Sequence, residues 1–444
     1  MTGYLILPED VRYDRARRVY NGMVDHYPLA IARCLDESDV RRVVQASLDV
    51  GLKLSVLGGG HGVTGRSIVD GGVVIDLSGM NYVRVSRQAR TATCGGGALL
   101  RDFDLATARS GLGTTLGIVS STGVAGLTLG GGLGWLMGRL GLACDNLIST
   151  RFVLTNGTVV VGGEADGQDA DLAWCMRGAG SSMGIATELT FNLHPVRWVV
   201  AGSIAFPIGR AAETSKRLDA LLRHGPDSLT VSPSFVNRKG EEVFILDICL
   251  YEGKKADQGS QYLSSIASFP YATRHTLRKR RYVDWQHALD DGSRSGLRSY
   301  WKTVDVESLD DCADIVAGAF AACPSRDTIV SFDHIHGVAS RIPTRPSCLA
   351  ERYSRLAVLI NSNWRYTAGD RSNLDWADEL WHALTASRPA HSAYGNYLPD
   401  SSRRRDQRVY GTHWTNVRRM RQRYDPVGAL SYESEEAGEV TISE

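Results

Sequence analysis

Apolar positions in the first third of the chain follow helical and strand spacing in turn. Residues 37–51 carry valine and leucine three and four positions apart, which predicts a helix. The apolar runs 53–57 and 73–77 predict two buried strands, and the first of these leads into a glycine-rich loop. A further helix is predicted near residues 98–110. Short strands and helices therefore follow one another over the first hundred residues.

The pattern changes beyond this region. Glycine, serine and threonine dominate residues 111–134, and Asn156-Gly157 between two apolar runs predicts a β-hairpin. Glycine then becomes rarer, and the expected elements are a strand at 203–206, a helix near 211–223 and a strand at 243–251. This spacing indicates a second layered domain, followed by a separate closing segment.

Composition narrows the class of protein. The 444 residues exceed what one core usually organises, which predicts two or three domains. A net charge of +1 gives no reason to expect nucleic acid as a partner, and no apolar run reaches the roughly 20 residues that span a membrane. The start, Met1-Thr2-Gly3-Tyr4, lacks the features of a signal peptide, and the dispersed cysteines form no metal or disulfide pattern. We expect a cytoplasmic protein without a metal site.

Two glycine-rich loops are candidates for phosphate binding, because backbone without side chains can approach an anion closely. They cover residues 58–62 and 126–134. Residues 60–67 nearly match a P-loop, but Arg66 stands where lysine is required and a strand follows instead of a helix. The second loop lacks the strand–helix spacing of a Rossmann motif, so conventional NAD binding is not expected.

His61 stands among glycines, so no neighbouring side chain shields its imidazole. From the residues alone it is either a loop histidine that caps a backbone group or a residue presented to a cofactor. A role as a metal ligand is disfavoured, because no second histidine lies at ligand spacing.

The order of several motifs resembles the berberine bridge enzyme-like branch of the vanillyl-alcohol oxidase and p-cresol methylhydroxylase (PCMH) superfamily. The matching pieces are Gly58-Gly59-Gly60-His61, Val74-Ile75-Asp76-Leu77-Ser78, the run 123–132, Gly141-Leu142-Ala143-Cys144-Asp145-Asn146, Gly184-Ile185-Ala186-Thr187 and Tyr394-Gly395-Asn396-Tyr397. The resemblance implies an α+β, two-domain PCMH-type fold whose antiparallel substrate domain is flanked by helices. It divides the chain into an FAD-binding domain at 1–197, a substrate-binding domain at 198–390 and a C-terminal segment at 391–444 that returns to the FAD domain.

The resemblance also implies FAD as the cofactor, bound through a single covalent 8α-histidyl link to His61. Relatives that attach the flavin twice use a cysteine where this chain has Val119, and Cys144 lies in a different motif, where a buried packing role is expected. The cofactor-binding residues implied are His61, Gly58, Gly59, Gly60, Gly62, Thr122, Gly123, Gly126, Leu127, Gly130, Gly131, Gly132, Asp145, Asn146, Gly184, Ile185 and Asn396.

Catalytic residues are less sharply defined. Hydride transfer from a carbon that bears O–H or N–H requires a group to take the proton. Tyr394 and Tyr397 resemble tyrosines that face the flavin in related oxidases, although they could also simply pack against the ring. Lys302, His336 and Glu351 are further candidates to orient or deprotonate the substrate, and each could instead be a surface or structural residue.

The resulting expectation is an oxidase that transfers hydride to flavin N5 and uses molecular oxygen. Its substrate is expected to be a mid-sized aromatic or polycyclic secondary metabolite, because aromatic residues gather in the second domain. The reaction would be alcohol or hydroquinone oxidation or an oxidative cyclisation. Two alternatives remain at this point: a non-redox protein that binds a flavin or a drug on the same fold, and a dehydrogenase that uses another electron acceptor.

Overall fold

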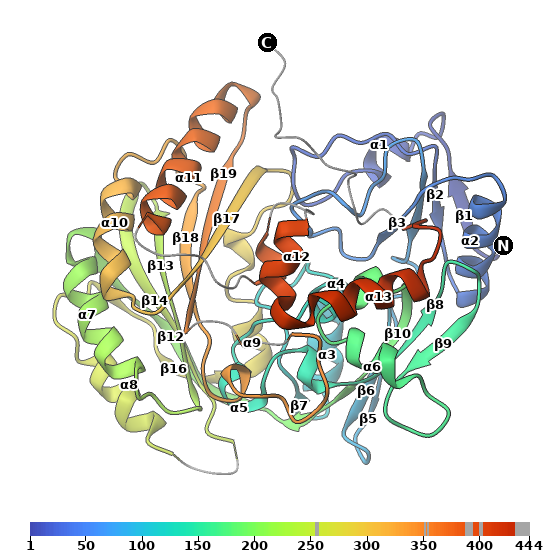
Figure 1. Cartoon of the computed structure of the whole chain (residues 1–444). Helices are drawn as coiled ribbons and strands as arrows, with labels where there is room; N and C mark the ends of the chain where they lie inside the picture. Colours follow the sequence, from blue (N-terminus) through green and yellow to red (C-terminus); the bar gives the residue numbers. More distant parts are fainter. Residues whose placement is uncertain (254–256, 350–351, 353–354, 387–393, 399–402, 431–444) are drawn as a thin grey trace.

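The computed structural model describes residues 1–253, 257–349, 352, 355–386, 394–398 and 403–430. Within them the chain forms one eight-stranded sheet and three smaller sheets. Figure 1 shows the large sheet on one side of the molecule and the smaller sheets on the other. This is the mixed helix and antiparallel-sheet architecture that the sequence predicts.

The four-stranded sheet carries the first glycine-rich loop. Its strands, in the order β1-β2-β4-β3, are β1 (Tyr4–Ile6), β2 (Ala30–Arg33), β4 (Val73–Asp76) and β3 (Leu54–Leu57). The last three run parallel, so the loop that follows β3 leaves the carboxyl edge of the sheet. Helix α2 (Glu37–Asp49) is capped by Asp36, whose side chain accepts a hydrogen bond from the backbone N–H of Asp39. The predicted helix and both predicted strands are confirmed.

The five-stranded antiparallel sheet completes the first half of the chain. Its strands, in the order β5-β6-β10-β8-β9, are β5 (Val83–Ser86), β6 (Thr91–Gly95), β10 (Ile185–Asn192), β8 (Leu147–Val153) and β9 (Val159–Gly162). The β8–β9 hairpin turns at Asn156-Gly157 as predicted, with Gly157 at φ 78°. Four short or medium helices pack here: α3 (Leu100–Ala108), α4 (Val124–Leu129), α5 (Met137–Leu140) and α6 (Ala170–Cys175). Helix α1 (Tyr13–Ala16) precedes β2, and β7 (Leu112–Gly113) pairs with β11 (His194–Pro195).

The eight-stranded sheet begins just beyond residue 197, the expected domain boundary. Its path is β15 (Arg274–His275), β12 (Trp198–Pro207), β14 (Glu241–Leu250), β13 (Leu229–Arg238), β18 (Ile329–His334), β19 (Leu356–Trp364) and β17 (Arg298–Val306), with β16 (Arg278–Arg281) also on β12. The associated helices are α7 (Ala211–Leu222), α8 (Gly259–Ala267), α9 (Tyr282–Gln286), α10 (Asp310–Phe320) and α11 (Asp370–Thr385). The elements predicted at 203–206, 211–223 and 243–251 form within β12, α7 and β14.

Strand alternation gives this sheet two different faces. Val330, Phe332 and Val358 point into an apolar core that α7, α10 and α11 close with Leu218, Val316 and Trp376. These helices cover the outer face of the sheet in Figure 1. The opposite face of the sheet is therefore directed toward the first half of the chain.

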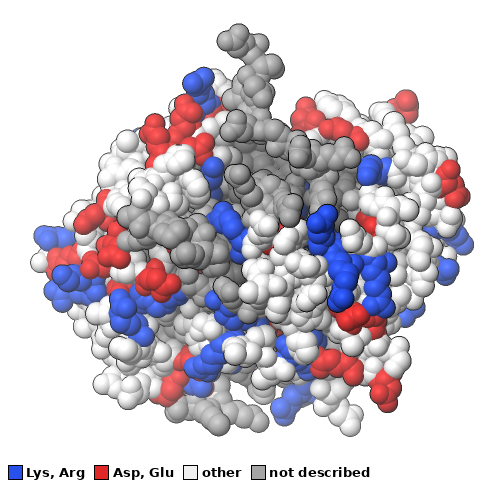
Figure 2. Space-filling model, in the orientation of Figure 1, with Lys and Arg blue, Asp and Glu red and all other residues white. Residues whose placement is uncertain are grey.

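The C-terminal helices α12 (Arg403–Tyr410) and α13 (Trp414–Tyr424) pack back on the first half of the chain. Val417, Met420 and Tyr424 join its core, and Leu430 forms a parallel bridge with Leu54. Figure 2 shows acidic and basic residues interspersed on this face, with basic residues gathered over α13. Two of these basic residues are engaged: Arg421 binds Asp406, and Arg423 binds Asp171 at 2.5 Å. In the part of the chain described, none of the helices combines the length and apolar character that a membrane crossing requires.

Candidate active site

A cavity of about 980 Å³ lies between the two halves of the chain. One wall consists of the glycine-rich loop 58–62 and the segment 117–127. The other wall is the inner face of the eight-stranded sheet, where the side chains opposite the apolar core are exposed to the cavity. These include Ser232 and Ser234 of β13, Asp247 of β14, Ser331 and Asp333 of β18, Leu359 and Asn361 of β19, and Trp301 of β17.

The two glycine-rich segments touch each other through residues that have no side chain. A Cβ on Gly59 would lie 2.2 Å from the backbone nitrogen of Gly123, and a Cβ on Gly123 would lie 2.6 Å from the nitrogen of Gly59. Any side chain at either position would therefore force the loops apart. The loop 58–62 and the segment 117–127 therefore form one continuous wall of the cavity.

This contact predicts a measurable cost for Gly59→Ala. Because the added methyl group meets backbone, we expect a loss of about 1–3 kcal/mol in the free energy of unfolding and a lower flavin content after purification. Urea unfolding and the visible absorbance of the native protein measure the two effects. Gly62→Ala is the matched control for stability, since a Cβ there meets no atom within 4 Å. Equal stability of both variants would contradict the contact.

His61 lines the cavity at the end of the first loop. Its Nε2 lies 2.9 Å from Oγ of Ser121, and its ring stacks on Tyr20 with the centroids 4.0 Å apart. Burial lowers the pKa of His61 to about 4. The imidazole is therefore neutral near pH 7, with a nitrogen lone pair available as a nucleophile.

The cavity can accommodate a dinucleotide of the expected kind. The predicted cofactor residues that line it are Gly58, Gly59, Gly60, His61, Gly62, Thr122, Gly123, Gly126, Leu127, Gly184 and Asn396. The buried hydroxyl of Ser67 also lines the cavity and has no hydrogen-bond partner among the described residues. A polar ligand in the cavity would satisfy this hydroxyl, because buried polar groups are costly when unpaired. The residues present thus fit a bound FAD.

Three predicted cofactor residues, Gly130, Gly131 and Gly132, lie outside the cavity lining. Their backbone instead receives the segment around Tyr394: a Cβ on Gly130 would lie 2.0 Å from Oδ1 of Asn396, and the Gly132 N–H donates to the Tyr394 hydroxyl at 2.9 Å. Gly130 and Gly132 thus contact Asn396 and Tyr394, which do line the cavity. Direct contact of the three glycines with the cofactor stays a prediction.

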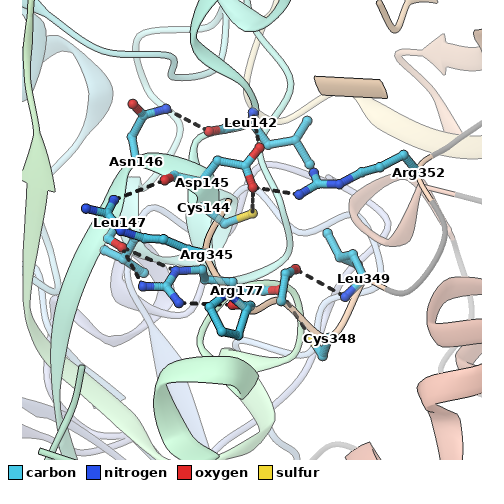
Figure 3. A network of polar contacts seen from close by, with 12 residues as sticks. Leu142, Cys144, Asp145, Asn146, Leu147, Arg177, Arg345, Cys348, Leu349 and Arg352 are labelled. Atoms are coloured by element: carbon cyan, nitrogen blue, oxygen red, sulfur yellow. Dashed lines mark hydrogen bonds and ion pairs between the residues drawn. The ribbon is translucent and has the colours of Figure 1, made fainter. Parts of the chain in front are cut away.

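Asp145, Asn146 and Ile185 also lie outside the cavity lining, and their contact with the cofactor stays a prediction. Asp145 accepts hydrogen bonds from the Leu142 N–H at 2.8 Å and from Arg352 at 2.7 Å. The Asn146 amide donates to the carbonyl groups of Leu140 and Leu142. Figure 3 shows the two residues within a polar network that joins this loop to the segment around Leu349, and Ile185 is a fully buried core residue. Cys144 is buried as predicted.

Two of the candidate catalytic residues, Lys302 and His336, lie outside the cavity lining. Lys302 points to the outer face of the sheet, where its Nζ pairs with Asp378 of α11 at 2.8 Å. His336 lies outside the cavity lining and stacks on His334 with the centroids 4.4 Å apart. Neither residue lines the cavity, because strand alternation and the turn after β18 direct them elsewhere. Their placement favours the surface or structural role that the sequence left open for both. Glu351 lies outside the described residues.

Tyr394 and Tyr397 both line the cavity, but their hydroxyl groups make different hydrogen bonds. The Tyr394 hydroxyl accepts hydrogen bonds from the Gly132 N–H and from the Asn396 amide at 2.8 Å. Burial raises the pKa of Tyr394, so this phenol is protonated near pH 7. The Tyr397 hydroxyl donates to Oδ2 of Asp333 at 2.8 Å.

Asp333 is the functional candidate that the sequence does not single out. It is 9% exposed and lines the cavity, and burial raises its pKa to about 6, although the hydrogen bond from Tyr397 opposes this shift. The alternation of side chains along β18 could have identified Asp333 from the sequence. Val330 and Phe332 belong to the core, so Ser331 and Asp333 must lie on the other face of the sheet. A buried carboxylate with a perturbed pKa in a cavity is typical of a catalytic base.

Comparisons with known proteins agree with this geometry. Residues 28–163 match the FAD binding domain family. The chain is 28% identical over 414 residues to an FAD-linked oxidoreductase of Dictyostelium discoideum, an alignment that covers 92% of this chain and 88% of that protein.

Solved structures share the fold over nearly the whole chain. The 6-hydroxy-D-nicotine oxidase of Arthrobacter nicotinovorans has a TM-score of 0.88 and 24% identity, covering 97% of this chain and 96% of that one. BBE-like 1 of Physcomitrella patens has a TM-score of 0.85 and 22% identity, covering 96% and 95%. The chain is an FAD-dependent oxidoreductase with the two-domain fold of the PCMH and berberine bridge enzyme-like oxidases.

Proposed function

We propose that this protein is an oxidase that carries FAD through one covalent bond to His61 and passes electrons from a mid-sized aromatic substrate to molecular oxygen. The single tether is supported by the neutral imidazole in the cavity wall and by valine at position 119, which also lines the cavity. When bound, the flavin accepts a hydride from the substrate carbon.

The observation that carries an enzymatic function is the hydrogen bond between the buried Asp333 and the half-buried Tyr397. A substrate O–H or N–H next to Tyr397 passes its proton to the phenol oxygen while the phenol proton moves to Asp333. The protonated carboxyl then returns its proton to water when the product leaves. Tyr397 serves as a relay and not as the final acceptor, because burial raises its pKa above the ordinary value of a phenol.

The substrate class is supported by the inner face of the sheet. Trp301 and Tyr397 pack edge to face with their centroids 5.9 Å apart and present aromatic surface to the cavity. Trp301 Nε1 and Asn361 Oδ1 are buried without a hydrogen-bond partner among the described residues. One donor and one acceptor beside aromatic rings favour a flat substrate that bears a polar substituent. The 6-hydroxy-D-nicotine oxidase of the same fold is named for a small substrate of this kind.

The pKa of Asp333 predicts the pH dependence of the reductive step. Its carboxylate accepts a proton only when ionised, so the rate of flavin bleaching by substrate should be constant well above pH 6 and fall as the pH decreases through that value. Below the pKa the loss should approach about tenfold for each pH unit. Anaerobic stopped-flow absorbance checks this profile. A rate that does not change across this range would exclude Asp333 as the base.

The proposed oxidase is tested by reducing the purified protein chemically in the absence of air and then admitting oxygen. An oxidase regains the yellow spectrum within seconds and releases hydrogen peroxide. A dehydrogenase with another acceptor reoxidises slowly in air but rapidly with a quinone or dye. A binding protein on the same fold is identified if a broad panel of phenols, alcohols and cyclic amines never bleaches the flavin.

A further inference from the structure

We propose that Ser121 is a positioning residue for flavin attachment, which holds the imidazole of His61 so that Nδ1, and not Nε2, forms the bond to the 8α-carbon. This inference rests on the proposed covalent link. It assigns a role in flavin attachment to a serine that no catalytic step requires.

The hydroxyl of Ser121 is fixed in space by the segment that carries it. The Ser120 N–H donates to Asp290 at 2.8 Å, and the Thr122 carbonyl accepts from the Leu100 N–H at 2.9 Å. The Gly117 carbonyl accepts from the Gln286 amide at 3.1 Å. Because both neighbours of Ser121 are held, its Oγ remains 2.9 Å from Nε2 of His61.

Tyr20 fixes the plane of the same imidazole. The two rings are 24° from parallel, and the Tyr20 N–H donates to the Gly60 carbonyl at 2.9 Å, immediately before His61. The Tyr20 hydroxyl also lies 3.1 Å from Oγ of Ser293, which restrains the ring at its far end. Stacking sets the plane of the imidazole and Ser121 sets its rotation within that plane. The orientation of both ring nitrogens is thus determined before any flavin binds.

These contacts distinguish the two nitrogens chemically. Nε2 is occupied by Ser121, whereas Nδ1 has no hydrogen-bond partner among the described residues. A neutral imidazole carries one proton, and the serine hydroxyl can either accept it from Nε2 or donate to Nε2. In both cases Nε2 is engaged by Ser121 and Nδ1 is the nitrogen left open. In the tautomer with the proton on Nε2, which we assign to the reactive state, the lone pair lies on Nδ1.

Attachment replaces one C–H bond of the 8α-methyl group and one N–H bond of the imidazole with a C–N bond. Two electrons and two protons leave in the process, and molecular oxygen accepts them as hydrogen peroxide. The proton lost from the ring is the one on Nε2. The Ser121 hydroxyl can accept from Nε2 before the reaction and donate to it afterwards, because a serine hydroxyl is both donor and acceptor.

The test compares full-length wild type, Ser121→Ala, Ser121→Thr and Ser120→Ala, each produced with limiting riboflavin and then incubated with excess FAD. Acid precipitation at intervals gives the rate at which flavin becomes acid-resistant, and NMR of the isolated flavinyl peptide identifies the linked nitrogen. Ser120→Ala is the matched control, since its buried hydroxyl has no partner among the described residues. Total flavin in each native protein verifies that the variants fold and bind FAD.

We expect wild type to be linked through Nδ1. Ser121→Ala should still bind FAD, but it should attach the flavin at least about tenfold more slowly. This is the scale of the loss when a hydrogen-bond partner that orients a metal-ligating histidine is removed. The variant should also form the link through both nitrogens. Ser121→Thr should restore the wild-type rate and nitrogen, and Ser120→Ala should match wild type. Linkage of wild type through Nε2, or an alanine variant with unchanged rate and nitrogen, would overturn this inference alone. Absence of any covalent flavin in wild type would overturn the proposed tether as well.

Discussion

Asp333→Asn is expected to slow flavin reduction by substrate by about two to four orders of magnitude, the usual contribution of a general base. The amide cannot take the proton that Tyr397 relays, although it preserves the volume and can still accept the 2.8 Å hydrogen bond. Flavin content and the unfolding midpoint should remain close to wild type. Anaerobic stopped-flow bleaching with any substrate found by screening measures the effect.

Two further variants test whether the loss of rate comes from the relay through Tyr397 and from this carboxylate alone. Tyr397→Phe removes the relay and should also reduce the rate, while leaving the carboxylate in the cavity. Asp305→Asn is the matched control, because Asp305 is a buried carboxyl of the same sheet that does not line the cavity. If Asp333→Asn and Asp305→Asn bleach at similar rates, Asp333 has no catalytic role. The asparagine variant should also lose the decrease in rate below pH 6.

His61→Ala is expected to abolish covalent attachment completely. Its flavin should be released by acid, whereas wild type should retain one flavin per chain. The loop backbone and the Gly59–Gly123 contact do not depend on the imidazole, so noncovalent FAD should still bind. Acid precipitation followed by absorbance of the pellet and supernatant measures the effect. His26→Ala, outside the cavity lining, is the control and should retain its flavin. Retention of acid-resistant flavin in the alanine variant would assign the tether to another residue.

Helices and turns that carry a short sequence motif, such as a cap or a turn dipeptide, can be predicted from this sequence. Helical spacing and the Asp36 cap define α2, and Asn156-Gly157 defines the β8–β9 turn. The residues that line the cavity are harder to predict, because sequence spacing does not say which strand face meets the other domain. Trp301 and Lys302 are neighbours in β17, yet one lines the cavity and the other pairs with α11. Both residue types suit a functional site, so only the packing of the helices decides between them.

Long-range contacts escape sequence analysis for a related reason. Asp333 and Tyr397 are 64 residues apart, and His61 and Ser121 are 60 residues apart. Each pair forms only because separate elements pack together, and neither pair leaves a local motif. The glycines at 130–132 are a different case. Their pattern is typical of cofactor loops, but Gly130 packs against Asn396, Gly131 accepts a hydrogen bond from the Cys144 N–H, and Gly132 contacts Ala143 and Tyr394.

The central claim is that His61 carries the flavin, and acid denaturation of the purified protein tests it most directly. Precipitated wild-type protein should remain yellow, and mass spectrometry of its digest should find the FAD mass on the peptide that contains His61 and on no other. Release of all flavin into the supernatant, or a flavin mass on a peptide that contains Cys144 or another residue, would contradict the claim.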